Sequence, residues 1–297
     1  VQPAGRVTAA IPGLDFGGAG SPLHFLHANG YPPACYRPLL GRLAEAHHVF
    51  GMLLRPLWPE ADPAPVRDWR PFSDDLRAFL HGQHGGPVIG VGHSIGAVVT
   101  LRAALREPGL FQALVLIDPV LLPPLVVTQL RVFHFLGLAD RFNARARAAR
   151  RRRRHFDDLE QLFAGYRRRE VFRRFSDENL HILIEGLTRP ARGGGYELVY
   201  SPEWEAHIYR TAIWNDRDIW SGLPRLQPPV LIIRGSHTDT FWARTARLME
   251  RRNPRIATLS VPEATHLVAL ERPEQVAGAA LDFLRRIAAG RREIVSP

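Results

Sequence analysis

The sequence predicts an α/β fold in which helices cover both faces of a doubly wound, mostly parallel sheet. Short apolar runs recur along the chain, and segments with helical periodicity separate most of them. Runs this apolar suit parallel strands that are covered on both faces, and alternation of strands with helices is typical of an open α/β sheet. One long helical block interrupts the alternation, which predicts an inserted cap.

The expected strands are six runs rich in valine, isoleucine and leucine. They lie near residues 22–27, 47–54, 87–92, 113–118, 229–235 and 256–261. The expected helices lie near residues 36–47, 72–82, 96–107, 241–252 and 273–290. The last of these has Pro273 at its start and Gly290 at its end, which are common residues at those two positions.

The alternation stops between Pro119 and Leu223, where the sequence is helical and arginine-rich and has no run typical of a strand. We therefore expect a core formed by residues 1–118 and 224–297. Residues 119–223 are expected to form a helical cap inserted after the sixth strand and lying over the carboxyl edge of the sheet. The apolar stretch 119–138 is expected to line the roof of a pocket.

Composition narrows the class of protein. The chain has 297 residues and 45% apolar side chains, enough for a sizeable core. Its one cysteine, Cys35, excludes an internal disulfide and a cysteine-based zinc site, and it agrees with a reducing compartment. The most apolar stretch is interrupted by prolines and an arginine, so we expect no transmembrane segment. The N-terminus lacks signal-peptide character, and we expect a cytoplasmic protein.

The formal net charge of +10 comes from arginine, because the chain contains no lysine. The densest run, residues 141–154, permits a nucleic-acid or membrane-surface interpretation. We favour a solvated cap helix whose long side chains cover apolar surface while their charged ends stay in water. No nucleic-acid partner is therefore expected. A third interpretation is that a cap arginine steers an anionic substrate.

A serine lies between two glycines where the strand near 87–92 passes into the helix near 96–107. The segment Gly92-His93-Ser94-Ile95-Gly96 fits the pattern Gly-x-Ser-x-Gly. The glycines allow the neighbouring chain to approach the tight turn, and the turn lifts the serine hydroxyl above the sheet. The backbone N–H of Ile95, at the start of the helix, can donate to a developing oxyanion. Ser94 is therefore a candidate nucleophile.

A serine nucleophile needs a base, and the base needs an orienting acid. In this architecture the expected chain order is serine, then an acid, then histidine. Asp239 follows the expected strand 229–235, and His266 follows the expected strand 256–261. Both are therefore expected in loops at the carboxyl edge of the sheet, where ligands bind in open α/β folds.

With these residues the chain resembles the α/β-hydrolase superfamily over nearly its whole length. The resemblance implies Ser94 as nucleophile, Asp239 as orienting acid and His266 as general base. The segment 26–33, LHANGYPP, resembles the oxyanion loop of the superfamily, with alanine in place of its usual glycine. This implies the N–H of Asn29 as the second oxyanion donor, with that of Gly30 as the alternative.

The resemblance leaves several alternatives open. Some relatives take the acid from the position that Asp118 occupies here, and a residue at this point can also hydrogen-bond the chain where the cap begins. We expect His27 to anchor the oxyanion loop, His93 to be structural or to line the wall of the site, and His237 to be exposed or supporting. No histidine and carboxylate spacing is typical of a metal site, so no metal and no cofactor are expected. Relatives also form dimers, so a homodimer is possible here.

The expected activity is that of a carboxylesterase-like serine hydrolase. It would cleave a carboxylic ester, or a related acyl bond, of a small, largely apolar substrate through an acyl-enzyme. The alternatives are a carbon–carbon bond, lactone or thioester hydrolase that uses the same triad. A further alternative is a non-catalytic binding protein that uses the basic cap.

Overall fold

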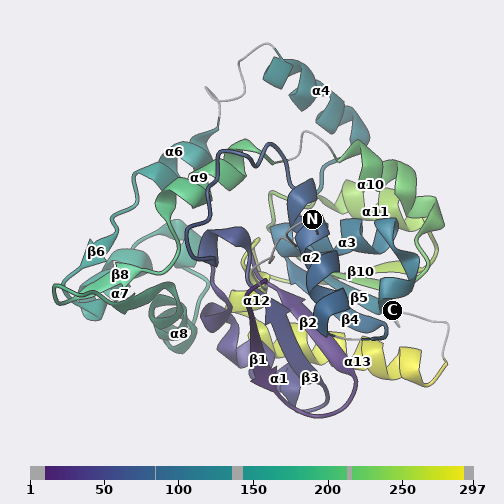
Figure 1. Cartoon of the computed structure of the whole chain (residues 1–297), viewed down its shortest axis with the longest axis horizontal. Coiled ribbons are helices and arrows are strands. Elements are labelled where there is room, and N and C mark those ends of the chain that lie inside the picture. Colours follow the sequence, from purple (N-terminus) through teal and green to yellow (C-terminus); the bar gives the residue numbers. More distant parts are fainter. Residues whose placement is uncertain (1–10, 84, 136–142, 213–215, 291–297) are drawn as a thin grey trace, which may run out of the picture.

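The computed structural model describes residues 11–83, 85–135, 143–212 and 216–290. Its main feature is a seven-stranded sheet with the order β1-β3-β2-β4-β5-β9-β10 (Figure 1). The strands are β1 (Gly13–Gly17), β2 (Pro22–Leu26), β3 (His48–Met52), β4 (Val88–His93), β5 (Phe111–Ile117), β9 (Val230–Gly235) and β10 (Ile256–Val261). All neighbouring strands are parallel except β1 and β3. The fold class predicted from the sequence is confirmed.

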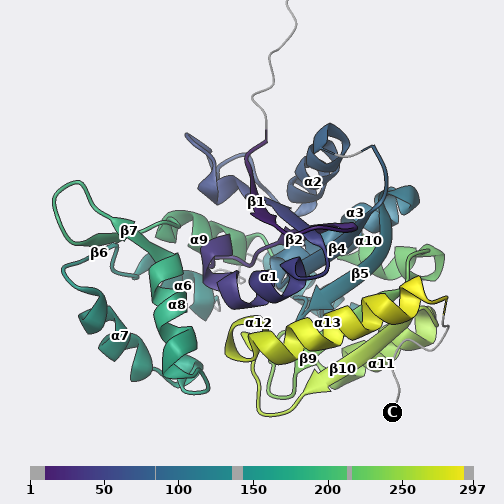
Figure 2. The same cartoon turned by 90° about the horizontal axis from the view of Figure 1, so that it is seen from below.

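Helices cover both faces of this sheet, as the apolar strands require. Figure 2 shows α1 (Arg37–Ala44) and α13 (Pro273–Ala288) on one face and α2 (Arg70–Gln83), α3 (Ile95–Arg106) and α10 (Arg217–Gly222) on the other. The helix α11 (Ala243–Arg252) packs through Met249 into the same apolar cluster as α3. Strand β4 is buried at every residue, so the turn that follows it rests on a rigid base.

The chain between β5 and β9 leaves the sheet and returns to it. It contains the helices α4 (Pro124–Phe135), α6 (Ala144–Arg150), α7 (Leu159–Arg167), α8 (Asp177–Leu187) and α9 (Pro202–Arg210), followed by α10. It also contains a small sheet of β6 (His155–Phe156), β7 (Thr188–Pro190) and β8 (Tyr196–Leu198) in the order β6-β8-β7. Short 3-10 helices occur at 33–36, 55–57, 108–110, 170–172 and 223–225, and α12 (Val268–Glu271) precedes α13. We call residues 119–212 of this segment the cap where the structure describes them.

Three details differ from the expectations. The excursion begins after the fifth strand of the described chain rather than the sixth. The expectation of a purely helical cap misses the three cap strands, which have two or three residues each and are too short to show an alternating pattern. Helix α10 packs against α3 of the core, through the pairs of Arg102 with Asp216 and Asp218. Within the described residues, no helix is both long and apolar enough to cross a membrane.

Candidate active site

Ser94 occupies the sharp turn between β4 and α3. Its backbone has φ +58° and ψ −118°, a conformation that L-residues rarely adopt. The turn is tight enough that a Cβ atom on Gly96 would lie 2.1 Å from the carbonyl oxygen of Leu26. Glycine is thus required at this position, and the pattern recognised in the sequence has a steric cause. Ser94 is 6% exposed, so its hydroxyl is largely removed from bulk water.

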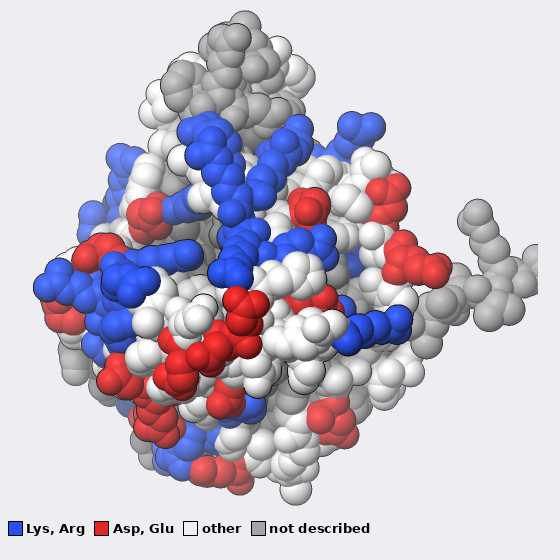
Figure 3. Space-filling view, turned by 90° about the vertical axis from the view of Figure 1, so that its left-hand side faces the viewer, with Lys and Arg blue, Asp and Glu red and all other residues white. Residues whose placement is uncertain are grey.

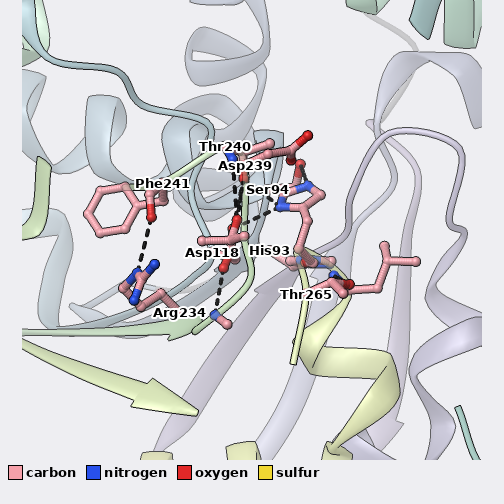
Figure 4. A network of polar contacts seen from close by, with 12 residues as sticks. His93, Ser94, Asp118, Arg234, Asp239, Thr240, Phe241 and Thr265 are labelled. Carbon is pink, nitrogen blue, oxygen red and sulfur yellow. Dashed lines mark hydrogen bonds and ion pairs between the residues drawn. The ribbon is translucent and has the colours of Figure 1, made fainter. Parts of the chain in front are cut away.

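The imidazole of His266 joins Ser94 to a buried carboxylate. Figure 4 shows the network of polar contacts to which Ser94, Asp118 and Thr240 belong. The Nε2 atom of His266 lies 2.9 Å from the Ser94 Oγ, and its Nδ1 atom lies 2.9 Å from Oδ1 of Asp118. An ionised carboxylate can only accept, so Nδ1 carries the proton and donates a hydrogen bond to Asp118. Nε2 is then free to accept the hydrogen of the Ser94 hydroxyl. This is the arrangement that raises the nucleophilicity of a serine.

Asp118 lies directly after β5 and is completely buried. Its Oδ1 accepts hydrogen bonds from the hydroxyls of Thr238 at 2.5 Å and Thr240 at 2.8 Å, and its Oδ2 accepts from the N–H of Gly235 at 2.8 Å. Its own N–H donates to the carbonyl of Ile233 at 2.7 Å. With the imidazole, the carboxylate has four donors, which compensate the cost of burying its charge.

The contact that the sequence assigns to Asp239 is therefore made by Asp118. The Asp239 side chain is 70% exposed and pairs with Arg145 of α6. The physical reason is that buried and exposed side chains alternate in the loop after β9: Thr238 and Thr240 are buried, and Asp239 between them is exposed. The two threonines point to Asp118, so the residue between them points away from it. The prediction of Asp239 as the partner of His266 does not match the structure, and the alternative named for Asp118 does.

The amides predicted to bind an oxyanion lie beside Ser94. Ile95 is the first residue of α3, a helix of 12 residues, and both Ile95 and Asn29 line the same cavity as the serine. Neither backbone N–H donates a hydrogen bond to another described residue. Both are thus available to a ligand, and the positive end of the α3 dipole adds to the donor strength of the Ile95 amide.

His27 anchors the loop that carries Asn29. Its Nδ1–H donates to the carbonyl of Ala28 at 2.9 Å, and its Nε2 accepts from the N–H of Leu54 at 3.1 Å. Burial lowers the pKa of His27 to about 4, so the ring is neutral at neutral pH and can both donate and accept. The structure thus contains hydrogen bonds through which His27 can anchor the loop, as expected.

His93 is buried beside His266, with 5.2 Å between the ring centroids, and connects two loops. Its Nδ1 accepts from the hydroxyl of Tyr36 at 2.7 Å, and its Nε2–H donates to the carbonyl of His266 at 2.8 Å. The same Tyr36 hydroxyl accepts from the N–H of Ala28 at 3.3 Å. Burial, with a smaller contribution from nearby His266, lowers the pKa of His93 to about 3. A neutral network therefore links the loop of Asn29 to the backbone of His266.

A cavity of about 1050 Å³ opens above Ser94 and His266. Its lining is mainly apolar and comes from the core and the cap: Ala28, Trp69, Ile95, Val120, Leu130, Phe133, Val171, Ile208, Ala212 and Leu267. Ionisable side chains enter it at Arg145, His237 and Asp239, of which His237 also contacts Glu263 at 3.0 Å. The helix α4, from the stretch expected to form a pocket roof, contributes Leu130 and Phe133.

The arginine run lies largely in α6 and the residues after it, and much of it forms ion pairs with carboxylates. Arg145 pairs with Asp239, Arg152 with Glu205, Arg153 with Asp157 and Arg154 with Glu203. Figure 3 shows arginine side chains over the cap face of the molecule, with carboxylates among them. Arg141 and Phe142, at the start of the run, lie outside the described residues. Within the described residues, no group of three histidine, cysteine or carboxylate side chains could hold a metal ion.

The family follows from a comparison of the whole chain. A family model described as the alpha/beta hydrolase family matches residues 25–280, which include all of the residues described above at the site. The chain belongs to the alpha/beta hydrolase family. The resemblance drawn from the motifs is thereby confirmed.

The proteins similar to this member of the family include a hydrolase of a succinate derivative and an esterase. The 2-(acetamidomethylene)succinate hydrolase of Mesorhizobium japonicum is 25% identical over 267 residues, which cover 90% of this chain and 89% of that protein. A crystal structure of E-2-(acetamidomethylene)succinate hydrolase superposes with a TM-score of 0.72 at 22% identity, covering 92% and 94% of the two chains. An esterase from Thermogutta terrifontis, with malate bound, superposes with a TM-score of 0.66 at 20% identity, covering 93% of each chain.

Proposed function

We propose that this protein is a serine hydrolase that cleaves a carboxylic ester, or a related acyl bond, of a small and largely apolar substrate. The observation that carries the proposal is the position of the His266 ring between the Ser94 hydroxyl and the buried carboxylate of Asp118, 2.9 Å from each. Membership of the alpha/beta hydrolase family agrees with it. The catalytic acid in this proposal is Asp118 and not Asp239.

The reaction begins with Ser94. Its Oγ attacks the carbonyl carbon of the substrate while Nε2 of His266 takes the hydroxyl proton. The ring then carries a positive charge, which Asp118 stabilises through Nδ1–H while it holds the imidazole in the required tautomer and orientation. The two threonines on Asp118 fix the carboxylate, so this stabilisation requires little rearrangement during the reaction.

Attack places a negative charge on the carbonyl oxygen of the substrate. The amides of Ile95 and Asn29 are the donors to this oxyanion, and loss of one such donor typically lowers turnover about 10²–10³-fold. Collapse of the tetrahedral intermediate breaks the acyl bond, and His266 gives its proton to the leaving group. A water molecule activated by the same histidine then attacks the acyl-enzyme and releases Ser94.

A second candidate is the hydrolysis of an acyl bond in a substrate that carries a carboxylate. The observation that favours it is Arg145, a cationic side chain in the lining of an otherwise largely apolar cavity. The relative from Mesorhizobium japonicum acts, by its name, on a succinate with an acetamido group, which combines an amide with two carboxylates. Such a substrate would use the same nucleophile and would place one carboxylate near the guanidinium.

The test is a panel of esters with acyl chains of different length and charge, assayed with the wild type and with Ser94→Ala. We expect ester hydrolysis by the wild type and a loss of about 10⁴-fold or more in Ser94→Ala. The matched control is Ser221→Ala, because Ser221 is an exposed serine of α10 outside the cavity lining. Equal activity of the wild type and Ser94→Ala would refute the proposal. A wild type inactive on every ester would favour a carbon–carbon bond, lactone or thioester as the substrate, or a binding function of the cap.

A further inference from the structure

The side chain of Asn29 is held by the cap rather than by the core that carries it. Its Nδ2 donates to the backbone carbonyl of Glu205 in α9 at 3.0 Å, and its Oδ1 accepts from the hydroxyl of Tyr200 at 3.0 Å. Asn29 is 5% exposed, Tyr200 1% and Glu205 6%. Both polar ends of this amide are therefore paired with the cap across a buried interface, and water does not compete for them.

The next residue of the loop touches the same helix. Gly30 has φ +77°, and a Cβ atom at this position would lie 2.9 Å from the carboxyl carbon of Glu205. The Glu205 carboxylate itself is paired with Arg152, whose other nitrogen donates to the hydroxyl of Tyr166 at 2.9 Å. Helix α9 thus lies in direct contact with the loop and is itself held in the cap by a buried ion pair.

The core holds only the base of this loop. His27 and Tyr36 bind the backbone of Ala28, and the N–H of Tyr31 donates to the carbonyl of Ala28 at 3.3 Å. No hydrogen bond to a described residue of the core holds the side chain of Asn29. The backbone N–H of Asn29 is the second oxyanion donor of the proposed reaction. Because the side chain of this residue is held by the cap, the position of the donor depends on contacts made by the cap.

We infer that the cap positions the oxyanion loop. Tyr200 and the Glu205 backbone hold the side chain of Asn29, so that the backbone N–H of Asn29 faces the reacting carbonyl. This rests on the proposed hydrolase function. Tyr200 is a positioning residue, since it acts through Asn29 and does not line the cavity. Burial raises the pKa of Tyr200 well above its usual value, so the hydroxyl remains a donor throughout the working range of pH.

A functional consequence follows from this arrangement. The nucleophile, its histidine and its acid belong to the core, whereas one oxyanion donor is held in position from the cap. A substrate that holds the cap away from the core would still meet Ser94 but would find the oxyanion site incomplete. Turnover would then depend on closure of the cap over the acyl group, which selects substrates that fit the closed cavity.

The test compares Tyr200→Phe with Thr188→Val in the full-length protein. Both remove one buried hydroxyl from the cap, but the Thr188 hydroxyl donates to the carbonyl of Ile184 in α8 and not to the oxyanion loop. An oxyanion donor that is misplaced rather than absent should lower kcat about 10–100-fold. We expect this loss in Tyr200→Phe with KM changed less than about threefold, and a change in kcat below about threefold in Thr188→Val. Melting temperatures of both variants are measured alongside, to show that the two have lost similar stability.

A second variant tests the contact itself. Asn29→Ala keeps the backbone amide and removes both contacts with the cap, so it should lose at least as much kcat as Tyr200→Phe. The double variant should be no slower than Asn29→Ala alone, because the tyrosine then has nothing left to hold. Additive losses would overturn the inference, as would equal kcat in Tyr200→Phe and Thr188→Val. A wild type that hydrolyses no ester and is not covalently labelled by a fluorophosphonate, a reagent that reacts with activated serines, would instead refute the proposed function.

Discussion

Replacing Asp118 by asparagine tests the assignment of the catalytic acid. The substitution keeps the shape of the side chain and exchanges one carboxylate oxygen for an NH₂ group. Asp118 is fully buried and accepts from His266, Thr238, Thr240 and the Gly235 amide. An NH₂ group must therefore face at least one donor. If it faces His266, Nδ1 must accept, which moves the proton to Nε2, where it blocks the removal of the serine proton.

The loss expected for Asp118→Asn is about 10⁴-fold in kcat, the size seen when the acid of a serine triad is neutralised and the histidine takes the wrong tautomer. That corresponds to about 5.4 kcal/mol of transition-state stabilisation. The unpaired donors should also lower the free energy of unfolding by about 1–3 kcal/mol. Asp239→Asn is the matched control, because it removes an exposed pair worth about 0.2–1 kcal/mol.

The assay is steady-state hydrolysis of a neutral ester at pH 8, with urea unfolding of each variant. We expect Asp239→Asn to keep kcat within about tenfold of the wild type. The reasoning is refuted if it is Asp239→Asn that loses about 10⁴-fold in kcat, or if Asp118→Asn folds and retains near wild-type turnover.

Three further predictions concern the turn, the buried histidine and the cavity. Gly96→Ala should destabilise the fold by about 1–3 kcal/mol or more and lower kcat, because the added Cβ atom would lie 2.1 Å from the carbonyl oxygen of Leu26. An unchanged melting temperature would contradict this prediction. The pKa of His93 is about 3 in the folded chain, below its ordinary value of about 6.5 in the unfolded chain. As pH falls below about 6.5, the unfolded chain therefore binds a proton at His93 before the folded chain does, and the free energy of unfolding decreases. The stability advantage of the wild type over His93→Gln should therefore shrink by about 2 kcal/mol between pH 7 and pH 5 in urea titrations, and a constant difference would contradict a neutral buried ring. Arg145→Gln should lower kcat/KM for a carboxylate-bearing ester about 3–10-fold at low salt and leave its neutral analogue unchanged, whereas equal effects on both esters would exclude recognition of charge.

Much of the sheet could be predicted from the sequence because its strands are buried on both faces. All six apolar runs correspond to strands of the structure. The strand β1 was not predicted, since residues Gly13–Gly17 are mostly exposed and include two glycines and an aspartate. An edge strand of this kind is defined by its pairing with β3, which a local pattern does not reveal.

Ser94 and His266 could be predicted because each follows a strong strand signal at the same edge of the sheet. The acid could not be chosen in this way, because Asp118 and Asp239 follow β5 and β9, which are neighbours in the sheet. Either loop could reach the histidine. The signal that distinguishes them was the sequence Thr-Asp-Thr at 238–240, in which two hydroxyls on one side of the chain can serve a carboxylate that comes from elsewhere.

The contacts of Asn29 with the cap could not be predicted from sequence patterns. Tyr200 and Glu205 are 171 and 176 residues away along the chain, and no periodicity connects them to the loop. Their role depends on how the cap lies on the core, which is determined by packing between α9, α6 and the oxyanion loop. The sequence therefore indicates the reacting groups more readily than the groups that position them.

The most direct measurement of the central claim is covalent labelling with a fluorophosphonate, followed by mass spectrometry of the intact chain and of its peptides. The account predicts one adduct per chain, located on Ser94, and a rate of labelling that falls sharply in His266→Ala and Asp118→Asn but little in Asp239→Asn. A folded wild type that remains unlabelled, or that carries the adduct on another residue, would contradict it.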